Sequence, residues 1–161
     1  GYGACFRLIV PPACAKGKTD FGARMDPRLP TLGLAGVDFA LAAVCWLILL
    51  CTYPDFARWR AEGFAAAHDA YTRRVGWVIG PLLALQMVGH LAVAYLDGAY
   101  LGLALVVVCW ALTAGWSVPC HRRLRDEGPA SPALDGLIRS HRWRTALWTL
   151  TAIDSIGRAA G

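Results

Sequence analysis

Three long stretches of the chain carry almost no charge. Residues 29–54 contain one charged side chain, Asp38, and the stretches 75–96 and 98–121 contain no Asp, Glu, Lys or Arg. A helix needs about 20 mostly apolar residues to cross roughly 30 Å of hydrocarbon. A helix in a soluble bundle would instead keep a charged face toward water. The pattern therefore predicts three membrane-spanning helices, at about 31–53, 75–96 and 99–120.

A fourth and shorter apolar stretch lies near the C-terminus. Residues 145–153 are uncharged, and Arg144 and Asp154 flank them. Ser131-Pro132 is typical of a helix start, since a capping serine precedes a proline at the first helical position. Arginine side chains can extend such a helix because they reach back to the membrane surface. We therefore expect a long last helix that contains a fourth span at about 141–159.

The segment 55–74 has a different periodicity. Apolar and aromatic residues recur there at spacings of three to five, and charged residues fall between them. This pattern is typical of an amphipathic helix at a membrane surface. The fold class predicted from the sequence is therefore all-α: a polytopic membrane four-helix bundle with an amphipathic cytoplasmic helix between spans 1 and 2.

The second predicted span contains two features that affect helix packing. Gly76-x-x-x-Gly80 predicts the close approach of another helix, because small residues allow helix backbones to meet. Pro81 follows directly and predicts a bend, because proline removes one backbone hydrogen bond.

Composition and charge agree with a membrane protein. Of the 161 residues, 57% are hydrophobic and 17% are charged, whereas soluble domains have roughly 45–50% and about 25%. The net charge of +5 does not indicate a nucleic-acid partner, because ten of the 16 Lys and Arg lie in the segments 55–74 and 121–144. The positive-inside rule then places both segments in the cytoplasm and both termini outside a bacterial inner membrane.

The N-terminal segment does not fit this pattern. Arg7, Pro11 and Pro12 interrupt any apolar run, so the segment lacks the core of a signal peptide. We expect residues 1–28 to be a disordered or non-native extension, with Met25 as the native start, and residues 29–161 to form the four-span domain. A start at Met25 would sharpen the charge asymmetry, since it removes four Lys and Arg from the outer side.

Three ionisable residues are predicted at similar depth in the membrane. With a rise of 1.5 Å per residue, Asp38 and His90 each lie about 22 Å from the inner ends of their spans, and Asp154 about 20 Å. With Gln86 they form the predicted intramembrane polar cluster, a pocket for a head group, a proton relay or a metal site. Alternatively, Asp154 pairs with Arg158, Asp38 lies near the interface and His90 bonds to a neighbouring helix.

A second group of residues maps to the cytoplasmic ends of the spans. This inner-face cluster consists of His68, Tyr71, His121, His141, Arg144 and Trp148. Arg144 is suited to bind an anionic group such as a lipid phosphate or a carboxylate. Three histidines at one level are compatible with a metal, but no two have the i,i+4 spacing of ligands on one helix, and we assign no metal. The alternative is ordinary packing of His and Arg at the interface.

Short motifs in the chain resemble a known group of proteins. They are Tyr53-Pro54, His68-x-x-Tyr71-x-x-Arg74, Trp116-Ser-Val-Pro-Cys-His121-Arg-Arg-Leu124 and Ser140-His-Arg-Trp143-Arg144-Thr145-Ala-Leu-Trp148-Thr149. Together they resemble small four-span bacterial membrane proteins of unknown function, which are distantly similar to the anthrone-oxygenase-like membrane proteins. The resemblance implies a four-helix membrane bundle and assigns no catalytic residue.

Three functions remain open from the sequence. The favoured one is a protein of the lipid bilayer that binds a lipid or a quinone-like hydrophobic molecule, or that joins a homodimer or larger membrane complex as an accessory subunit. The second is an oxidoreductase or oxygenase-like enzyme on a hydrophobic aromatic substrate, with His68, His121 and His141 as acid, base or ligand groups. The third is a proton-coupled transporter, a dimer, that uses Asp38, His90 and Asp154. No cofactor is assigned.

Overall fold

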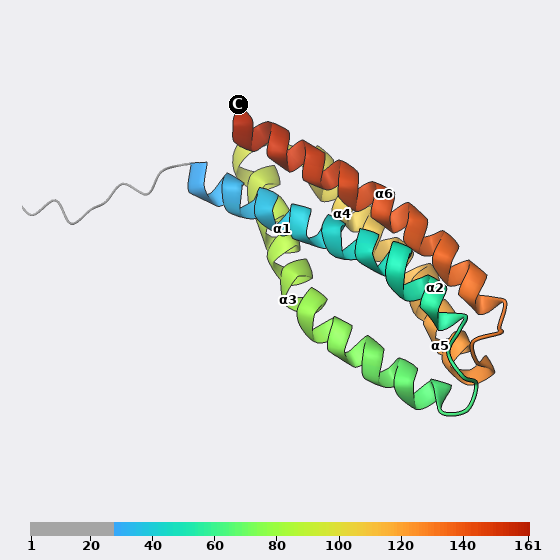
Figure 1. Cartoon of the computed structure of the whole chain (residues 1–161). Coiled ribbons are helices and arrows are strands. Elements are labelled where there is room, and N and C mark those ends of the chain that lie inside the picture. Colours follow the sequence, from blue (N-terminus) through green and yellow to red (C-terminus); the bar gives the residue numbers. More distant parts are fainter. Residues whose placement is uncertain (1–27) are drawn as a thin grey trace, which may run out of the picture.

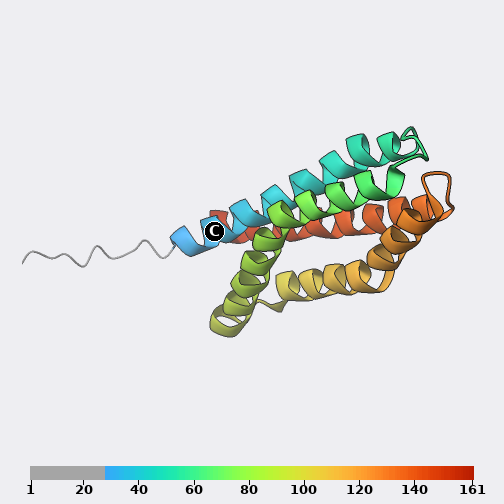
Figure 2. The same cartoon turned by 90° about the horizontal axis from the view of Figure 1, so that it is seen from below.

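The computed structural model describes residues 28–161, and the described chain is helical with short connections (Figures 1 and 2). The expectation for the N-terminal extension and for Met25 lies outside the described residues, except that Arg28 already belongs to the first helix. The helices are α1 (Arg28–Leu47), α2 (Tyr53–Phe56), α3 (Phe64–Asp97), α4 (Tyr100–Leu112), α5 (Val118–Glu127) and α6 (Ala133–Ala160).

Three helical segments are long and apolar enough to cross a membrane. They are Leu29–Phe56, Phe64–Asp97 and Tyr100–Glu127. Each contains one of the three spans predicted from the uncharged stretches. The chain is therefore an all-helical protein with the character of a membrane protein. The helix α6 is equally long but falls outside this set, because its sequence carries more polar and charged residues.

Two π-helical turns join the shorter helices into continuous segments. Ile48–Thr52 connects α1 to α2, and Thr113–Ser117 connects α4 to α5. In both turns the N–H that closes the wide turn belongs to the residue before a proline: Tyr53 donates to Ile48 O, and Val118 donates to Thr113 O. The helix widens where Pro54 and Pro119 remove a donor. Such bulges are frequent at functional sites, and both lie beside the pocket described below.

The segment 55–74 does not form a helix of its own. Residues 57–63 form a non-helical connection, and Phe64 to Arg74 are the first turns of the long helix α3. The aromatic face of the segment packs against the protein itself: the Phe56 ring lies 5.7 Å from the His68 ring and 5.1 Å from the Tyr71 ring. The periodicity therefore reflects internal packing of a hairpin between two long helices.

Helix α3 bends near its middle (Figure 2), and Pro81 lies inside the helix. The predicted bend is thus present. Gly76 and Gly80 allow a close helix approach, but no other helix of the described chain uses it, since no atom lies within 4 Å of a Cβ built at either glycine.

The long helical segments lie side by side, and their connections gather at opposite ends (Figures 1 and 2). The connections 57–63 and 128–132 lie at one end, named here the arginine-rich end. The α3–α4 turn at Gly98, whose φ is 67°, lies at the other end with the start of α1 and the C-terminus. The helix α6 packs against α1, α4 and α5, and α3 packs against the same three helices.

Candidate functional site

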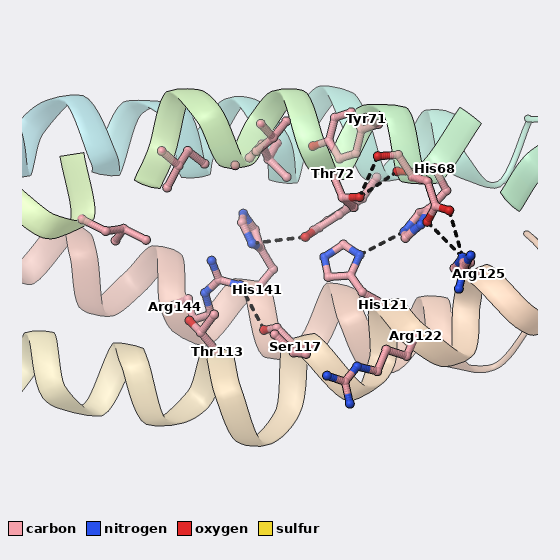
Figure 3. A pocket seen from close by; sticks show the side chains of 18 residues that line it. His68, Tyr71, Thr72, Thr113, Ser117, His121, Arg122, Arg125, His141 and Arg144 are labelled. Carbon is pink, nitrogen blue, oxygen red and sulfur yellow. Dashed lines mark hydrogen bonds and ion pairs between the residues drawn. The ribbon is translucent and has the colours of Figure 1, made fainter. Parts of the chain in front are cut away.

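A pocket toward the arginine-rich end lies among α3, α5 with the π-helical turn before it, and α6 (Figure 3). Its volume is about 510 Å³, within the range of small-molecule sites. One part of the wall is apolar, with Val75, Ile79 and Leu83 on α3 and Val118 on α5. The other part is polar and holds five of the six residues of the inner-face cluster: His68, Tyr71, His121, His141 and Arg144.

Arg144 points into this pocket from α6 and is held on two sides. Its Nη1 donates to Ser117 Oγ at 3.0 Å, and Ser117 Oγ in turn lies 3.0 Å from Ser140 Oγ. The guanidinium carbon lies 4.9 Å from the centre of the Trp148 ring, within cation–π range. The Nε atom is buried and has no hydrogen-bond partner among the described residues. The guanidinium is thus fixed in orientation, with part of its donor set unused.

His68 and His121 form a hydrogen-bonded pair across the pocket (Figure 3). His68 Nε2 and His121 Nδ1 are 3.0 Å apart. One of these two nitrogens must carry the proton and the other must accept it, so the tautomers of the two rings are coupled. His68 Nδ1 is buried without a partner. Beside the pair, Asp69 and Arg125 form an ion pair at 3.0 Å at the exposed edge of the pocket.

The hydrogen bonds of His141 determine its tautomer. Its Nε2 lies 2.9 Å from Cys45 O, and a carbonyl can only accept, so Nε2 carries a proton that it donates. In a neutral ring Nδ1 is then an acceptor, and the Tyr53 hydroxyl, at 3.4 Å, can donate to it. Both nitrogens of His141 are therefore engaged, and this ring ties α6 to α1 at the pocket wall.

The intramembrane polar cluster forms a separate network around Asp38, in which His90 Nδ1 is buried and has no hydrogen-bond partner among the described residues. Asp38 accepts from Gln86 Nε2 at 2.7 Å, from His90 Nε2 at 3.0 Å and from Ser155 Oγ at 2.5 Å. Asp38, Gln86 and His90 are each 0% exposed. They line none of the three main cavities in the described part of the chain. Space beside His90 is also filled, since a Cβ added at Gly102 would lie 2.4 Å from His90 Nδ1.

Asp154 does not join this network. Its carboxylate pairs with Arg158 on the next turn of α6, as the alternative interpretation expected. Ser155, one residue further along, takes the place predicted for Asp154 and donates to Asp38. Asp38 is fully buried among the helices, and its depth in a membrane stays a prediction, whereas His90 does bond to a neighbouring helix, through Asp38 on α1.

Trp148 connects the two polar regions. Its ring lies under the Arg144 guanidinium at the pocket, and its Nε1 donates to Gln86 Oε1 at 3.1 Å in the intramembrane polar cluster. The side chain is 1% exposed and is not part of the pocket wall. Grouping Trp148 with the inner-face residues therefore describes its contact with Arg144 and leaves out its hydrogen bond to Gln86.

Several residues of the two regions escaped the sequence analysis. Ser117 and Thr113 line the pocket through the π-helical turn before Pro119, and a proline inside an apolar run was the available signal. Ser155 continues the spacing of His141, Trp148 and Thr151 by one more turn, so the periodicity of α6 could have identified it. The described residues contain no group of three or more His, Cys, Asp or Glu side chains placed to hold a metal ion.

The fold and the pocket define a helical protein of membrane character with one partly polar, partly apolar cavity. Comparison with protein-family models, with curated proteins and with solved structures finds no match for the chain. The resemblance to small four-span bacterial membrane proteins therefore stays a prediction.

Proposed function

We propose that the chain is a four-span integral membrane protein and that α6 is the fourth span. The support is the distribution of side chains on α6. The side of α6 that faces the other helices buries polar residues such as His141, Thr151 and Ser155. Leu150 and Ile153 point away from the other helices and are 52% and 60% exposed. Polar groups inside and apolar groups outside suit a lipid environment. The helix α6 differs from the three more apolar segments in its charged residues, among them Arg139, Arg142, Arg144, Asp154 and Arg158.

The proposed orientation places the arginine-rich end in the cytoplasm. The connections and helix ends there carry the arginines of segments 55–74 and 121–144, while Arg158 lies toward the other end. Short loops rich in Lys and Arg stay on the cytoplasmic side. Both termini then lie outside a cell membrane, and the pocket lies near the inner interface.

The proposed function of the pocket is to bind one hydrophobic small molecule, a lipid or a quinone-like compound. The observation that carries this proposal is the combination of a cavity of about 510 Å³, an apolar wall and a fixed arginine at its polar end. Ligand sites in proteins are mostly apolar cavities with a few convergent polar groups. The intramembrane polar cluster is less suited to transport or proton conduction, because its central carboxylate is saturated by three donors.

The enzyme alternative rests on the histidine pair. Coupled tautomers at His68 and His121 would let one ring take a proton from a bound molecule while the other releases one. Binding is the simpler proposal, because the hydroxyl that lies beside an oriented base in the pocket wall, Tyr53 beside His141, is 3% exposed and lies 3.4 Å from that base.

Filling the pocket tests its function. In Gly76→Phe the new ring would enter the pocket, because Gly76 lines it and has no atom within 4 Å of its Cβ position. Gly80→Phe is the matched control: Gly80 lies one turn further on α3, has equally open surroundings and does not line the pocket. Native mass spectrometry of the purified protein then measures retained hydrophobic molecules.

We expect the wild type and Gly80→Phe to retain one small molecule per chain, and Gly76→Phe to lose it while keeping its helical circular-dichroism spectrum. Retention by Gly76→Phe at the wild-type level, or the absence of any bound molecule in the wild type after extraction in several mild detergents, would show the proposed function to be wrong.

A further inference from the structure

The guanidinium of Arg144 has one hydrogen-bonding edge that no protein group uses. An arginine presents its N–H groups as a planar fork, and the Nε and Nη2 donors point in the same direction along one edge. In Arg144 the Nη1 group on the opposite edge donates to Ser117. Nε is buried without a partner, and Nη2 makes no hydrogen bond with the described residues. Neither of these two parallel donors has an acceptor among the described residues, and Nη2 is the one of the two that is not buried.

The neighbours of Arg144 hold this edge in a constant orientation. Ser117 fixes one end of the guanidinium, and Ser140 orients Ser117 through a hydrogen bond at 3.0 Å. The Trp148 ring supports the face of the guanidinium at 4.9 Å. Trp148 is itself fixed by its hydrogen bond to Gln86. A receptor group held in this way loses little conformational entropy when a ligand binds, which favours affinity.

No acidic side chain among the described residues that line the pocket pairs with Arg144. Among these described residues, Arg122, Arg125 and Arg144 carry positive charge and Asp69 alone carries negative charge. Asp69 pairs with Arg125 at 3.0 Å. Arg144 contacts a hydroxyl and an aromatic ring and has no carboxylate among its partners. A partly buried cation without a counter-ion is unfavourable, and a bound anion relieves that cost.

We propose that the pocket binds an amphiphile with an acidic head, a carboxylate or a phosphate, whose two oxygens accept from Nε and Nη2 of Arg144. This inference rests on the proposed function and specifies its ligand. Paired N–H donors recognise carboxylate and phosphate in a bidentate way. The apolar tail lies against Val75, Ile79, Leu83 and Val118. A quinone is the poorer ligand, because its two carbonyl oxygens lie on opposite sides of the ring and carry no charge.

The test measures binding of four probes to the full chain in phosphatidylcholine nanodiscs. Oleate carries a carboxylate head, oleoyl lysophosphatidate a phosphate head, oleyl alcohol the same tail without charge, and decylubiquinone a neutral quinone head. Arg144→Lys keeps the charge but removes the fork. Arg142→Lys is the matched control, because Arg142 is exposed on the same helix and does not line the pocket.

We expect at least one acidic probe to bind about ten-fold or more tightly than oleyl alcohol, since charged bidentate hydrogen bonds are about twice as strong as neutral ones. Arg144→Lys should weaken that probe about ten-fold or more, and Arg142→Lys should leave its affinity unchanged. The comparison of oleate with lysophosphatidate identifies the head group. If Arg144→Lys does not fold, the ratio of acidic to neutral probe on the wild type decides the question.

Three other results overturn the inference in distinguishable ways. Tight binding of decylubiquinone with no preference for acidic probes would keep the proposed function and reject the acidic head. Acidic binding that Arg144→Lys leaves intact would reject the role of the Arg144 edge. If no probe binds above the level of nanodiscs without protein, the inference and the proposed function both fail.

Discussion

Two polar regions lie within the same set of helices, and they differ in how completely their hydrogen bonds are satisfied. In the intramembrane polar cluster, Asp38 meets three donors, and Gln86 both donates to Asp38 and accepts from Trp148. In the pocket, Arg144 keeps an unused edge beside a cavity of about 510 Å³. The network around Asp38 leaves only His90 Nδ1 unpartnered among its described members and has no cavity beside it, so it stabilises the fold. An unsatisfied donor beside a cavity is instead suited to a ligand.

The two regions are also expected to differ in how a substitution affects the protein. Removing one member of a buried network leaves its partners unpaired, and unpaired buried groups cost more than the lost bond. Changing a group that faces a cavity leaves room for water or for a neighbouring side chain. The two regions should therefore respond differently to substitution, with stability lost in the first and ligand affinity lost in the second.

The largest effect is expected from Asp38→Ala. It would leave the donors of Gln86, His90 and Ser155 without their acceptor, and breaking such a buried pair costs about 3–5 kcal/mol. The measurement is the free energy of unfolding in mixed micelles. Asp55→Ala is the control, because the side chains of its ion pair with Arg58 are 60% and 79% exposed, and such exposed pairs contribute below about 1 kcal/mol. Equal losses in both variants would contradict the network around Asp38.

Gly102→Ala should cost about 1–3 kcal/mol of unfolding free energy, as overpacking does in close-packed interiors. The added Cβ would lie 2.4 Å from His90 Nδ1 and 2.5 Å from His90 Cε1, so the ring must shift away from Asp38. Gly157→Ala provides the comparison, because its Cβ position has no neighbour within 4 Å. There we expect no loss and a small gain in helix stability. An unchanged stability in Gly102→Ala would mean that the ring moves freely.

Trp148→Phe tests the two contacts of Trp148 separately, one in the pocket and one in the intramembrane polar cluster. The substitution keeps an aromatic ring under Arg144 but removes the donor to Gln86 Oε1. We expect the unfolding free energy to fall by about 1–3 kcal/mol, the cost of leaving a buried acceptor without its donor, while oleate affinity stays at the wild-type level. Trp148→Leu, which removes both contacts, should lower both quantities. Loss of affinity in Trp148→Phe would indicate that the hydrogen bond also positions Arg144.

The smallest effect on stability is expected from Ser117→Ala in the pocket. It removes the acceptor of Arg144 Nη1, while Ser140 keeps its bond to Leu137 O at 2.9 Å. Oleate affinity should fall roughly two- to twelve-fold, which corresponds to one hydrogen bond of 0.5–1.5 kcal/mol. Unfolding free energy should change little. Thr149→Ala, a hydroxyl removed outside the pocket, should leave affinity unchanged; an equal drop there would point to a general loss of helix packing.

The sequence predicted depth well because helix rise is constant. Counting residues placed Asp38 and His90 at one height, and the structure joins them at 3.0 Å. The sequence also predicted that the inner-face cluster lies at one level, and five of its residues line one pocket in the structure. This prediction was possible because the length of each apolar stretch indicates where the helix ends. These predictions needed no knowledge of helix rotation.

Counting residues does not predict how each helix is rotated about its own axis, and so which side chains face the other helices. Asp154 and Ser155 differ by 1.5 Å in height but by about 100° around the helix, and only the second faces Asp38. The buried side chains of α6 are a mixture of polar and apolar residues, so a hydropathy pattern alone gives little sign of which face is buried. The π-helical turns before Pro54 and Pro119 likewise change the rotation of Tyr53 and Ser117, which a regular helix would place elsewhere.

Photocrosslinking with a fatty acid that carries a diazirine in its tail tests the central claim most directly. The account predicts that label concentrates on peptides 75–83 and 113–118, the walls of the pocket, and that Gly76→Phe suppresses it while Gly80→Phe does not. Label spread over outward apolar side chains such as Leu91 and Ile153, at the same level in the wild type and both variants, would contradict a binding pocket among α3, α5 and α6.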